Sequence, residues 1–230
     1  MPEKMLLLQG TVGSTAYGLA RDGSDVDRIG IFAYHTMDVL SLDYTGDMES
    51  VVRHEPDVTV HEVAKYLRLA LKCNPTIMEL MWLPDHLYET RTEMGEWIIG
   101  LRSAVLCEDA VRASYGGYAK QQVERLKRRH AEGKVGFASD LQKRTAKHAR
   151  HCFRLLNQGR ELLETGHLPI QVQNPEDYFA FDGASVDEIV ARFAHEDEVF
   201  RNVTSVLPAR PDKPAVQSVL NKIRRTYWWD

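Results

Sequence analysis

The feature that most restricts the fold of this chain is a change, near residue 92, from alternating strand and helix signals to helical signals alone. In the first part, short apolar runs bounded by polar and turn residues are typical of strands. These runs occupy 5–8, 29–34, 51–53 and 58–60. A helical spacing of apolar residues follows at 61–73 and ends at Asn74-Pro75, because proline cannot continue a helix. We therefore expect an α+β fold in which residues 1–90 form a small α/β domain with a mixed sheet.

Residues 91–230 are expected to form a mainly helical second domain. Apolar residues recur at helical intervals through most of this part of the chain. The predicted helices are 93–101, 108–130, 138–165, 186–206 and 216–227. Thr165-Gly166 is a typical stop for the longest of them, since glycine readily adopts the left-handed conformation that ends a helix. Loops are predicted at 134–136, 174–175 and 208–214.

The composition indicates an ordinary globular protein, with 43% hydrophobic and 27% charged residues. No apolar run approaches the roughly 18–20 residues of a membrane span, and the short apolar core of residues 1–10 is typical of a strand rather than a signal peptide. The three cysteines, Cys73, Cys107 and Cys152, have no spacing that suggests zinc or redox chemistry. We therefore expect a cytoplasmic protein with reduced thiols and no membrane contact.

The net charge of −4 neither indicates nor excludes a nucleic-acid partner, but the charge is unevenly distributed. Between Lys120 and Arg160 there are twelve lysines and arginines against three acidic residues, whereas 176–198 is acidic. Such a distribution can produce a local positive surface on a mildly acidic protein. Its densest part, 125–130, either grips phosphates or is a solvated helix end, and it lacks the interleaved aromatic residues of single-strand platforms.

Two acidic residues precede the apolar run 29–34, in the sequence Ser24-Asp25-Val26-Asp27. Side chains alternate along a strand, so Asp25 and Asp27 would share one face while Val26 points into the core. Two carboxylates on one side repel each other unless a cation lies between them, and Mg²⁺ prefers such oxygen ligands. The pair is therefore a candidate site for Mg²⁺, with Mn²⁺ as the alternative ion.

A turn upstream of this pair, Gly13-Ser14, is expected to lead into a short helix capped by Ser14 or Thr15. Backbone N–H groups and the helix dipole at such a turn favour phosphate oxygens, and glycine permits close approach to the backbone. Gly13 and Ser14 are therefore candidate nucleotide-binding residues beside the carboxylates.

The stretch from Gly13 to Ile31 resembles the signature of the DNA polymerase β-like nucleotidyltransferases, in which Gly-Ser, a spacer and a glycine precede Ser-Asp-x-Asp. The matching residues are Gly13-Ser14, Gly18 and Ser24-Asp25-Val26-Asp27. More narrowly, Gly-Ser-x-Ala-Tyr-Gly followed by Ser-Asp-x-Asp and Gly-Ile is similar to a branch of predicted nucleotidyltransferases often found near RNA ligases. This first motif is the specific part of the resemblance.

The resemblance implies a third carboxylate on a neighbouring strand, which completes a site for two metal ions. Asp57 is the best candidate, because it opens the run 58–60 and leads into a helix that ends at Asn74-Pro75 and is followed by Glu79. Asp43 and Asp47 compete for this role. Asp25 and Asp27 would then bind both ions, and Asp57 would hold the ion on the nucleophile's side and accept its proton.

A weaker part of the resemblance lies in a later helix that contains Lys147, His151 and Arg154. Spacings of four and three place these residues on one face of the helix. They are candidate nucleotide-binding residues, whose cations would contact a triphosphate or an RNA backbone. A solvated face with salt bridges is the alternative.

The reaction that the resemblance implies is transfer of a nucleoside monophosphate from a nucleoside triphosphate, ATP among them, to an acceptor hydroxyl, with release of pyrophosphate. An RNA end is the favoured acceptor, because the helical half is basic. The alternatives are a protein or small-molecule acceptor, and a non-catalytic nucleic-acid-binding protein that keeps the fold. Intact Asp25 and Asp27 argue against the last. The sequence carries no signature of an oligomeric state.

Overall fold

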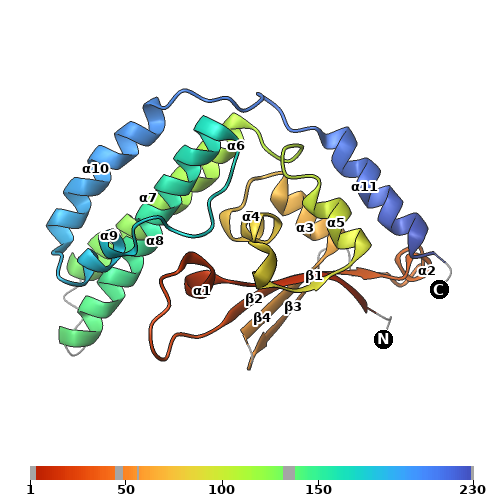
Figure 1. The fold of residues 1–230 in the computed structure, drawn as a ribbon, viewed down its shortest axis with the longest axis horizontal. Helices are drawn as coiled ribbons and strands as arrows, with labels where there is room; N and C mark the ends of the chain where they lie inside the picture. The colour runs from red at the N-terminus through yellow and green to blue at the C-terminus, as the bar shows by residue number, and fades with distance from the viewer. Residues whose placement is uncertain (1–3, 45–48, 56, 132–137, 229–230) are drawn as a thin grey trace. The chain divides into compact units, whose positions relative to one another are not determined.

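The computed structural model describes residues 4–44, 49–55, 57–131 and 138–228 (Figure 1). Contacts between Cα atoms divide the chain into two compact units. Unit 1 comprises Met1–Cys107 and Arg210–Asp230, and unit 2 comprises Glu108–Ala209. The contacts thus group 91–107 and the C-terminal segment with the sheet, whereas the sequence analysis grouped them with the helical half. A boundary between independently folding domains at residue 90 stays a prediction.

Unit 1 is built on a five-stranded mixed sheet with the order β3-β4-β2-β1-β5. The strands are β1 (Lys4–Val12), β2 (Asp27–Tyr34), β3 (Ser50–His54), β4 (Asp57–Glu62) and β5 (Tyr88–Arg91). β2 and β4 are parallel, and the other neighbouring pairs are antiparallel. The four apolar runs predicted as strands all lie in β1 to β4.

The two faces of the sheet differ in polarity around β1 and β2. Gly10 faces the helices, since a Cβ atom there would lie 2.4 Å from Leu83. Its ladder partner Ile29 shares this face, and so does Asp27 two residues earlier. On the opposite face, Glu89 of β5 accepts hydrogen bonds from three side chains of β1 and β2: Arg28, Gln9 and Thr11. Asp27 therefore lies at the start of β2 on the face that the helices cover.

Helices α3 (Val63–Ala70), α4 (Pro75–Trp82) and α5 (Glu93–Ile99) cover one face of the sheet (Figure 1). Helix α4 was not predicted from the sequence, because a proline after a helical pattern indicates the end of that helix. Proline at the first position of a helix begins one, and Asn74 caps α4 by accepting a hydrogen bond from the Ile77 N–H at 3.3 Å. Nearly all residues of α4 are buried, so its sequence has no amphipathic period.

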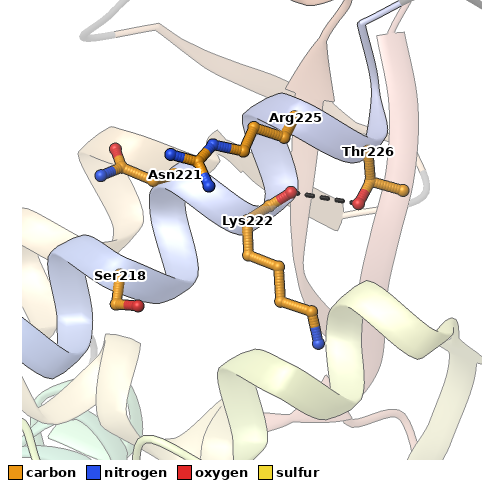
Figure 2. Close-up of a pocket in the computed structure, with 5 residues that line it drawn as sticks. All are labelled: Ser218, Asn221, Lys222, Arg225 and Thr226. Atoms are coloured by element: carbon orange, nitrogen blue, oxygen red, sulfur yellow. Dashed lines mark hydrogen bonds between the residues drawn. The ribbon is translucent and has the colours of Figure 1, made fainter.

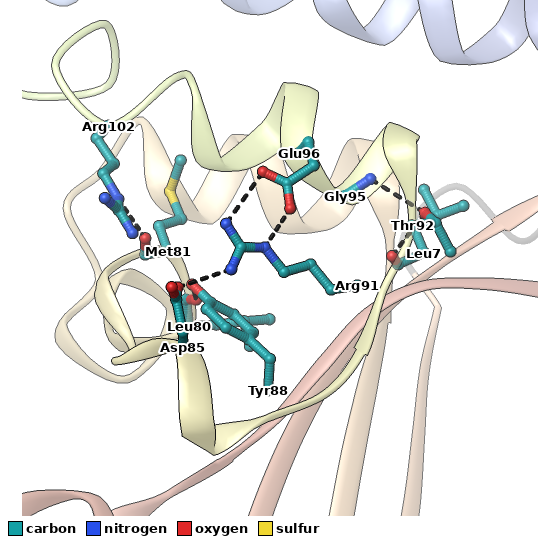
Figure 3. Close-up of polar contacts among 10 residues, drawn as sticks. All are labelled: Leu7, Leu80, Met81, Asp85, Tyr88, Arg91, Thr92, Gly95, Glu96 and Arg102. Atoms are coloured by element: carbon teal, nitrogen blue, oxygen red, sulfur yellow. Dashed lines mark hydrogen bonds and ion pairs between the residues drawn. The ribbon is translucent and has the colours of Figure 1, made fainter.

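Polar contacts hold the edge strand β5 (Figure 3). Arg91 donates hydrogen bonds to Asp85 at 2.7 Å and to Glu96. The Thr92 hydroxyl, just beyond the strand, donates to the Leu7 carbonyl of β1 at 2.8 Å. β5 was not predicted, because its sequence Tyr-Glu-Thr-Arg lacks an alternation of apolar and polar residues.

The C-terminal helix α11 (Lys213–Thr226) packs on α3 and α5 within unit 1. Arg224 donates a hydrogen bond to Glu62 at 2.5 Å, and Glu62 has no exposed surface. Thr36 donates to the backbone carbonyl of Arg224, also at 2.5 Å. α11 is therefore part of the packing of unit 1. The remaining helices of unit 1 are α1 (Gly13–Tyr17), α2 (Thr36–Val39) and the 3₁₀ turn η1 (Asp85–Leu87).

Unit 2 is helical throughout its described elements. These are α6 (Glu108–Val111), the π-helical turn η2 (Arg112–Gly116), α7 (Gly117–Ala131), α8 (Ala138–Thr165), α9 (Pro175–Phe179), the 3₁₀ turn η3 (Ala180–Asp182) and α10 (Val186–Asn202). Gly166 ends α8 with a φ of +72°, as predicted. The loop predicted at 174–175 is wrong, because Pro175 begins α9. The loop predicted at 134–136 lies outside the described residues.

A small residue and a half-buried arginine fix the packing of unit 2. A Cβ atom at Gly159 of α8 would lie 2.7 Å from Tyr115 and 2.8 Å from Phe200. The three segments that carry these residues therefore approach closely at Gly159. Arg112 donates to the carbonyls of Phe200 (3.1 Å) and Val203 (2.7 Å), which satisfies acceptors at the end of α10.

The predicted α+β class is confirmed by a mixed sheet with helices, followed by a mainly helical region. All three cysteines are free and buried. Burial raises the pKa of the Cys73 and Cys152 thiols to about 12, which makes these two thiols unreactive. Among the described helices, none has the length and apolar character needed to span a membrane.

Candidate functional site

The Gly13-Ser14 turn and Asp27 lie directly against each other. Val12, the last residue of β1, pairs with Asp27 at the start of β2, and α1 begins at the next residue. Gly13 has a φ of +70°, a conformation that favours glycine. A Cβ atom at Gly13 would lie 2.2 Å from the Asp27 Oδ2 atom. The Asp27 carboxylate thus occupies the space that a side chain at position 13 would fill.

Asp27 and Asp57 begin neighbouring parallel strands. The ladder pairs Arg28 with Val58, so the residues one step earlier lie side by side at the same end of the sheet and on the same face. Asp27 is half-buried and Asp57 is exposed. Asp25 lies in the exposed loop before β2, so the strand alternation used to orient it does not apply. Asp25 is close to Asp27 only because it lies two residues before it in the chain.

Asp43 and Asp47 were the competing candidates for the third carboxylate. Asp43 lies in the exposed turn after α2, beyond the C-terminal end of β2. Asp27 begins that strand at its other end, where Asp57 also lies. Asp47 lies outside the described residues. The register of the sheet therefore favours Asp57 over Asp43 as the partner of Asp27.

Helix α1 begins differently from the sequence prediction. Its N-cap is Val12, and no side chain in the described part of unit 1 makes a capping hydrogen bond there. Ser14 and Thr15 lie inside the single turn, so the expectation that either of them caps the helix is wrong. Gly18 ends the turn with a φ of +73°, and its N–H donates to the Thr15 carbonyl at 3.2 Å.

A buried carboxylate anchors α1 to the helix layer. The Tyr17 hydroxyl lies 2.7 Å from each carboxylate oxygen of Glu79 in α4. Glu79 is 1% exposed, so this contact lies inside the unit. From the sequence, Glu79 stands out only by its position after Asn74-Pro75. The two residues are 62 positions apart, and no spacing rule relates them.

The donor chemistry of this region fits a divalent metal ion. Asp25, Asp27 and Asp57 supply carboxylate oxygens, which Mg²⁺ and Mn²⁺ prefer, and Gly13 leaves room for the Asp27 group. In the ranges that the structure describes, no three His, Cys, Asp or Glu side chains are gathered as a metal-binding group. Asp27 and Asp57 are neighbours by the register of their strands, and Asp25 lies two residues before Asp27. The role of the three carboxylates as metal ligands stays a prediction.

Lys147, His151 and Arg154 lie on α8 in unit 2 and differ in exposure. Lys147 is exposed, His151 is half-buried and Arg154 is 3% exposed. Arg154 donates to Gln158 at 2.6 Å and lies 3.1 Å from His151 Nδ1. Burial, together with the Arg154 guanidinium, lowers the pKa of His151 to about 3, so the imidazole is neutral at pH 7 and Nδ1 accepts from Arg154. The structure therefore brings His151 and Arg154 together, while nucleotide binding by these residues stays a prediction.

A second imidazole of α8, His148, connects this helix to α7. Its Nδ1 atom lies 2.8 Å from Gln122 Oε1, and its Nε2 atom lies 2.8 Å from Arg129 Nη1. Because arginine only donates, Nε2 accepts and the ring proton is on Nδ1. Burial and the Arg129 charge lower the pKa of His148. The sequence analysis missed this link; the seven-residue spacing of Gln122 and Arg129 on α7 is the signal that could have suggested a shared face.

Two surface hollows lie on other helices. One is lined by polar and basic residues of α11: Ser218, Asn221, Lys222, Arg225 and Thr226 (Figure 2). The Lys222 ammonium lies 3.5 Å from the centroid of the Trp97 ring of α5. The other hollow is on α10, lined by His195, Glu198, Val199, Asn202 and Val203. None of the predicted site residues lines either hollow.

The sequence matches the family model described as RNA repair pathway DNA polymerase beta family (RlaP), over residues 3–192. No curated protein gives a significant match to the chain. The matched range contains the Gly13 to Asp27 motif, Asp57 and the α8 residues, and it ends before α11. The match agrees with the polymerase β-like nucleotidyltransferase resemblance, and at the family level it implies nucleotidyltransferase activity on a nucleotide substrate. Because the match covers most of its length, the chain belongs to the RNA repair pathway DNA polymerase beta family.

Proposed function

We propose that this protein transfers a nucleoside monophosphate from a nucleoside triphosphate to a hydroxyl group at an RNA end. The observation that carries the proposal is the packing of the Asp27 carboxylate against Gly13, beside Asp57 at the start of the parallel neighbour strand. A phosphate held at the Gly13-Ser14 turn is then adjacent to the carboxylates. RNA as the acceptor is supported by the description of the family as belonging to an RNA repair pathway.

In the proposed reaction the acceptor oxygen forms a bond to the α-phosphorus, the bond from this phosphorus to the bridging oxygen breaks, and pyrophosphate leaves. The Ser14 hydroxyl and the backbone N–H groups of α1 donate to phosphate oxygens, and Gly13 permits their approach. Asp57 accepts the proton of the acceptor hydroxyl. Mg²⁺ or Mn²⁺, held by Asp25, Asp27 and Asp57, would neutralise charge on the phosphates.

The proposal is tested by incubating the protein with Mg²⁺ and each α-labelled nucleoside triphosphate, with and without RNA. We expect label in RNA that is released by ribonuclease. Asp27→Asn is expected to reduce transfer at least about a hundredfold, since one charged oxygen donor is lost. Asp43→Asn is the matched control, because Asp43 is exposed and follows the other end of β2.

Three outcomes separate the alternatives. Label that resists ribonuclease assigns the acceptor to a protein or a small molecule. RNA binding without any transfer supports a non-catalytic protein that keeps the fold. Transfer that is unaffected by Asp27→Asn contradicts the proposed site.

A further inference from the structure

Basic side chains of α7 and α8 surround the two imidazoles of unit 2. Arg125 and Arg129 are four positions apart on α7 and therefore lie on the same face of that helix. This face is turned toward α8, because Arg129 contacts His148 at 2.8 Å. Lys147 precedes His148 on α8, and both Lys147 and Arg125 lower the pKa of His148 and of His151. Together with the buried Arg154, which contacts His151, these three cations from two helices lie around one pair of imidazoles.

Among the described residues, no carboxylate contributes to the pKa shift of either imidazole. The charged groups that act on the two imidazoles are cations or the other imidazole. Arg125 and Lys147 are exposed, and Arg129 is half-buried. Lys127, between the two arginines in sequence, is instead paired with Glu124 at 3.3 Å. Within the basic run 125–130, Arg125 and Arg129 therefore belong to the face turned toward α8, whereas Lys127 pairs with Glu124 of its own helix.

Arg129 is held in place before any ligand binds. Its guanidinium donates to His148 Nε2, and His148 Nδ1–H donates to Gln122, so the chain of contacts crosses from α8 back to α7. A guanidinium that is oriented in this way suits a phosphate group, to which it can donate two parallel hydrogen bonds. His148 is thus a positioning residue for Arg129.

An aromatic ring lies in the same helical row. Tyr118 precedes Gln122 by four positions on α7 and is 38% exposed. Base stacking on an exposed aromatic ring, next to cations that follow the backbone, is the usual arrangement in proteins that bind single strands. The ring that residues 125–130 lack is therefore supplied about two turns earlier on the same helix.

We propose that Arg125, Arg129 and Lys147, here called the α7–α8 basic face, bind the phosphate backbone of single-stranded RNA, with Tyr118 contacting a base. The identity of the polymer rests on the proposed function. Charges on two helices, with the two arginines one helical turn apart, contact more than one phosphate group along a strand.

The test is fluorescence anisotropy of a short labelled single-stranded RNA at several salt concentrations, without triphosphate or divalent metal. The double variant Arg125→Ala/Arg129→Ala is expected to weaken binding and to reduce the slope of log K against log salt by about 1.4, since each phosphate contact contributes about 0.7. Tyr118→Leu is expected to weaken binding about tenfold without changing the slope. Lys127→Ala, the matched control, is expected to keep the slope of the unmodified protein.

Thermal unfolding of each variant shows whether the fold is kept. The charge-preserving variant Arg125→Lys/Arg129→Lys then tests whether the loss of RNA binding follows from the lost charges. The double lysine variant is expected to keep most of the slope. The proposal is overturned if the double alanine variant keeps the full slope, or if Lys127→Ala lowers it equally. If the double alanine variant lowers the slope but the unmodified protein transfers no nucleotide, the proposed function is refuted and this face is supported. If the unmodified protein transfers nucleotide to RNA but the double alanine variant keeps the full slope, the proposed function is supported and this face is refuted.

Discussion

Gly13 and Asp27 show how one missing side chain shapes the candidate site. The backbone of Gly13 is left-handed, and the Asp27 carboxylate fills the volume where a Cβ atom would stand. Glycine is thus required here for two separate reasons, conformation and space. The second reason matters more for function, because it decides where the carboxylate lies.

Gly13→Ala is expected to reduce nucleotide transfer at least about a hundredfold, because the methyl group displaces the Asp27 carboxylate. Stability should fall by about 1–2 kcal/mol, the cost of a left-handed backbone. Gly23→Ala is the matched control: Gly23 has a φ of +79°, and a Cβ atom there meets nothing within 4 Å. Transfer assays and urea denaturation measure both effects. Equal loss of transfer in the two variants would show that displacement of Asp27 is not the cause.

Tyr17→Phe tests the anchor of α1. The change leaves the buried Glu79 carboxylate without the Tyr17 donor, so the free energy of unfolding should fall by about 1–3 kcal/mol. The KM for the triphosphate should rise as well, because α1 carries Ser14. Urea denaturation and steady-state kinetics provide the two readouts. Unchanged stability would mean that this contact contributes nothing to the fold.

Helix α11 lies beyond the range of the family match, yet its Arg224 pairs with Glu62, which has no exposed surface. Arg224→Ala is expected to destabilise the protein by about 3–5 kcal/mol, because Glu62 remains buried without its cation. Arg225→Ala, at the exposed neighbouring position, should change stability by less than about 0.5 kcal/mol. Chemical denaturation compares the two. Equal effects would show that the ion pair does not hold α11.

Helices and strands whose apolar residues recur at a regular spacing could be predicted from the sequence. Elements that are buried on nearly all sides, or short and polar, could not. Helix α8 has an apolar stripe and a glycine stop, and it was predicted with its observed bounds, 138–165. Helix α4 is apolar on nearly all sides, and β5 is a four-residue polar edge strand, so neither has a period to detect. Both α4 and α9 begin with a proline that the sequence analysis interpreted as a stop or a loop.

The pH dependence of stability is a property of the whole molecule to which two imidazoles contribute. Burial and Lys65 lower the pKa of His61 to about 4, and burial and Arg154 lower that of His151 to about 3. Histidines of the unfolded chain titrate near about 6.5, so below that pH the unfolded state binds protons that the folded state does not. Stability from these groups is therefore present above about pH 6.5 and is lost as the pH falls toward the folded-state pKa of each group, about 4 for His61 and about 3 for His151.

Urea denaturation between about pH 7.5 and 4.5 checks this window, in which each imidazole is expected to cost about 1–2 kcal/mol by pH 5. His61→Gln and His151→Gln should each flatten the pH profile. His167→Gln, at an exposed position, should leave the profile unchanged. A profile that is flat in the unmodified protein would contradict the assignment.

The candidate site was predictable where its residues are close in sequence. Gly13, Ser14, Asp25 and Asp27 form one local motif, and the antiparallel pairing of β1 with β2 brings its two ends together. Asp57 lies beside Asp27 because β4 pairs with β2 in a parallel register, and no local sequence pattern encodes that register. The contacts of Tyr17 with Glu79, and of His148 with Gln122 and Arg129, join separate helices, so they follow only from tertiary packing.

In the proposed site, the carboxylates beside the Gly13-Ser14 turn hold divalent cations against a nucleotide. Anomalous diffraction from crystals of the protein grown with Mn²⁺ and a non-hydrolysable triphosphate analogue would locate these cations. We expect an anomalous peak about 2.0–2.3 Å from carboxylate oxygens of Asp25 and Asp27, with a phosphate oxygen as a further ligand. A peak away from both residues, or a triphosphate bound without contact to the Gly13-Ser14 turn, would contradict the proposed site.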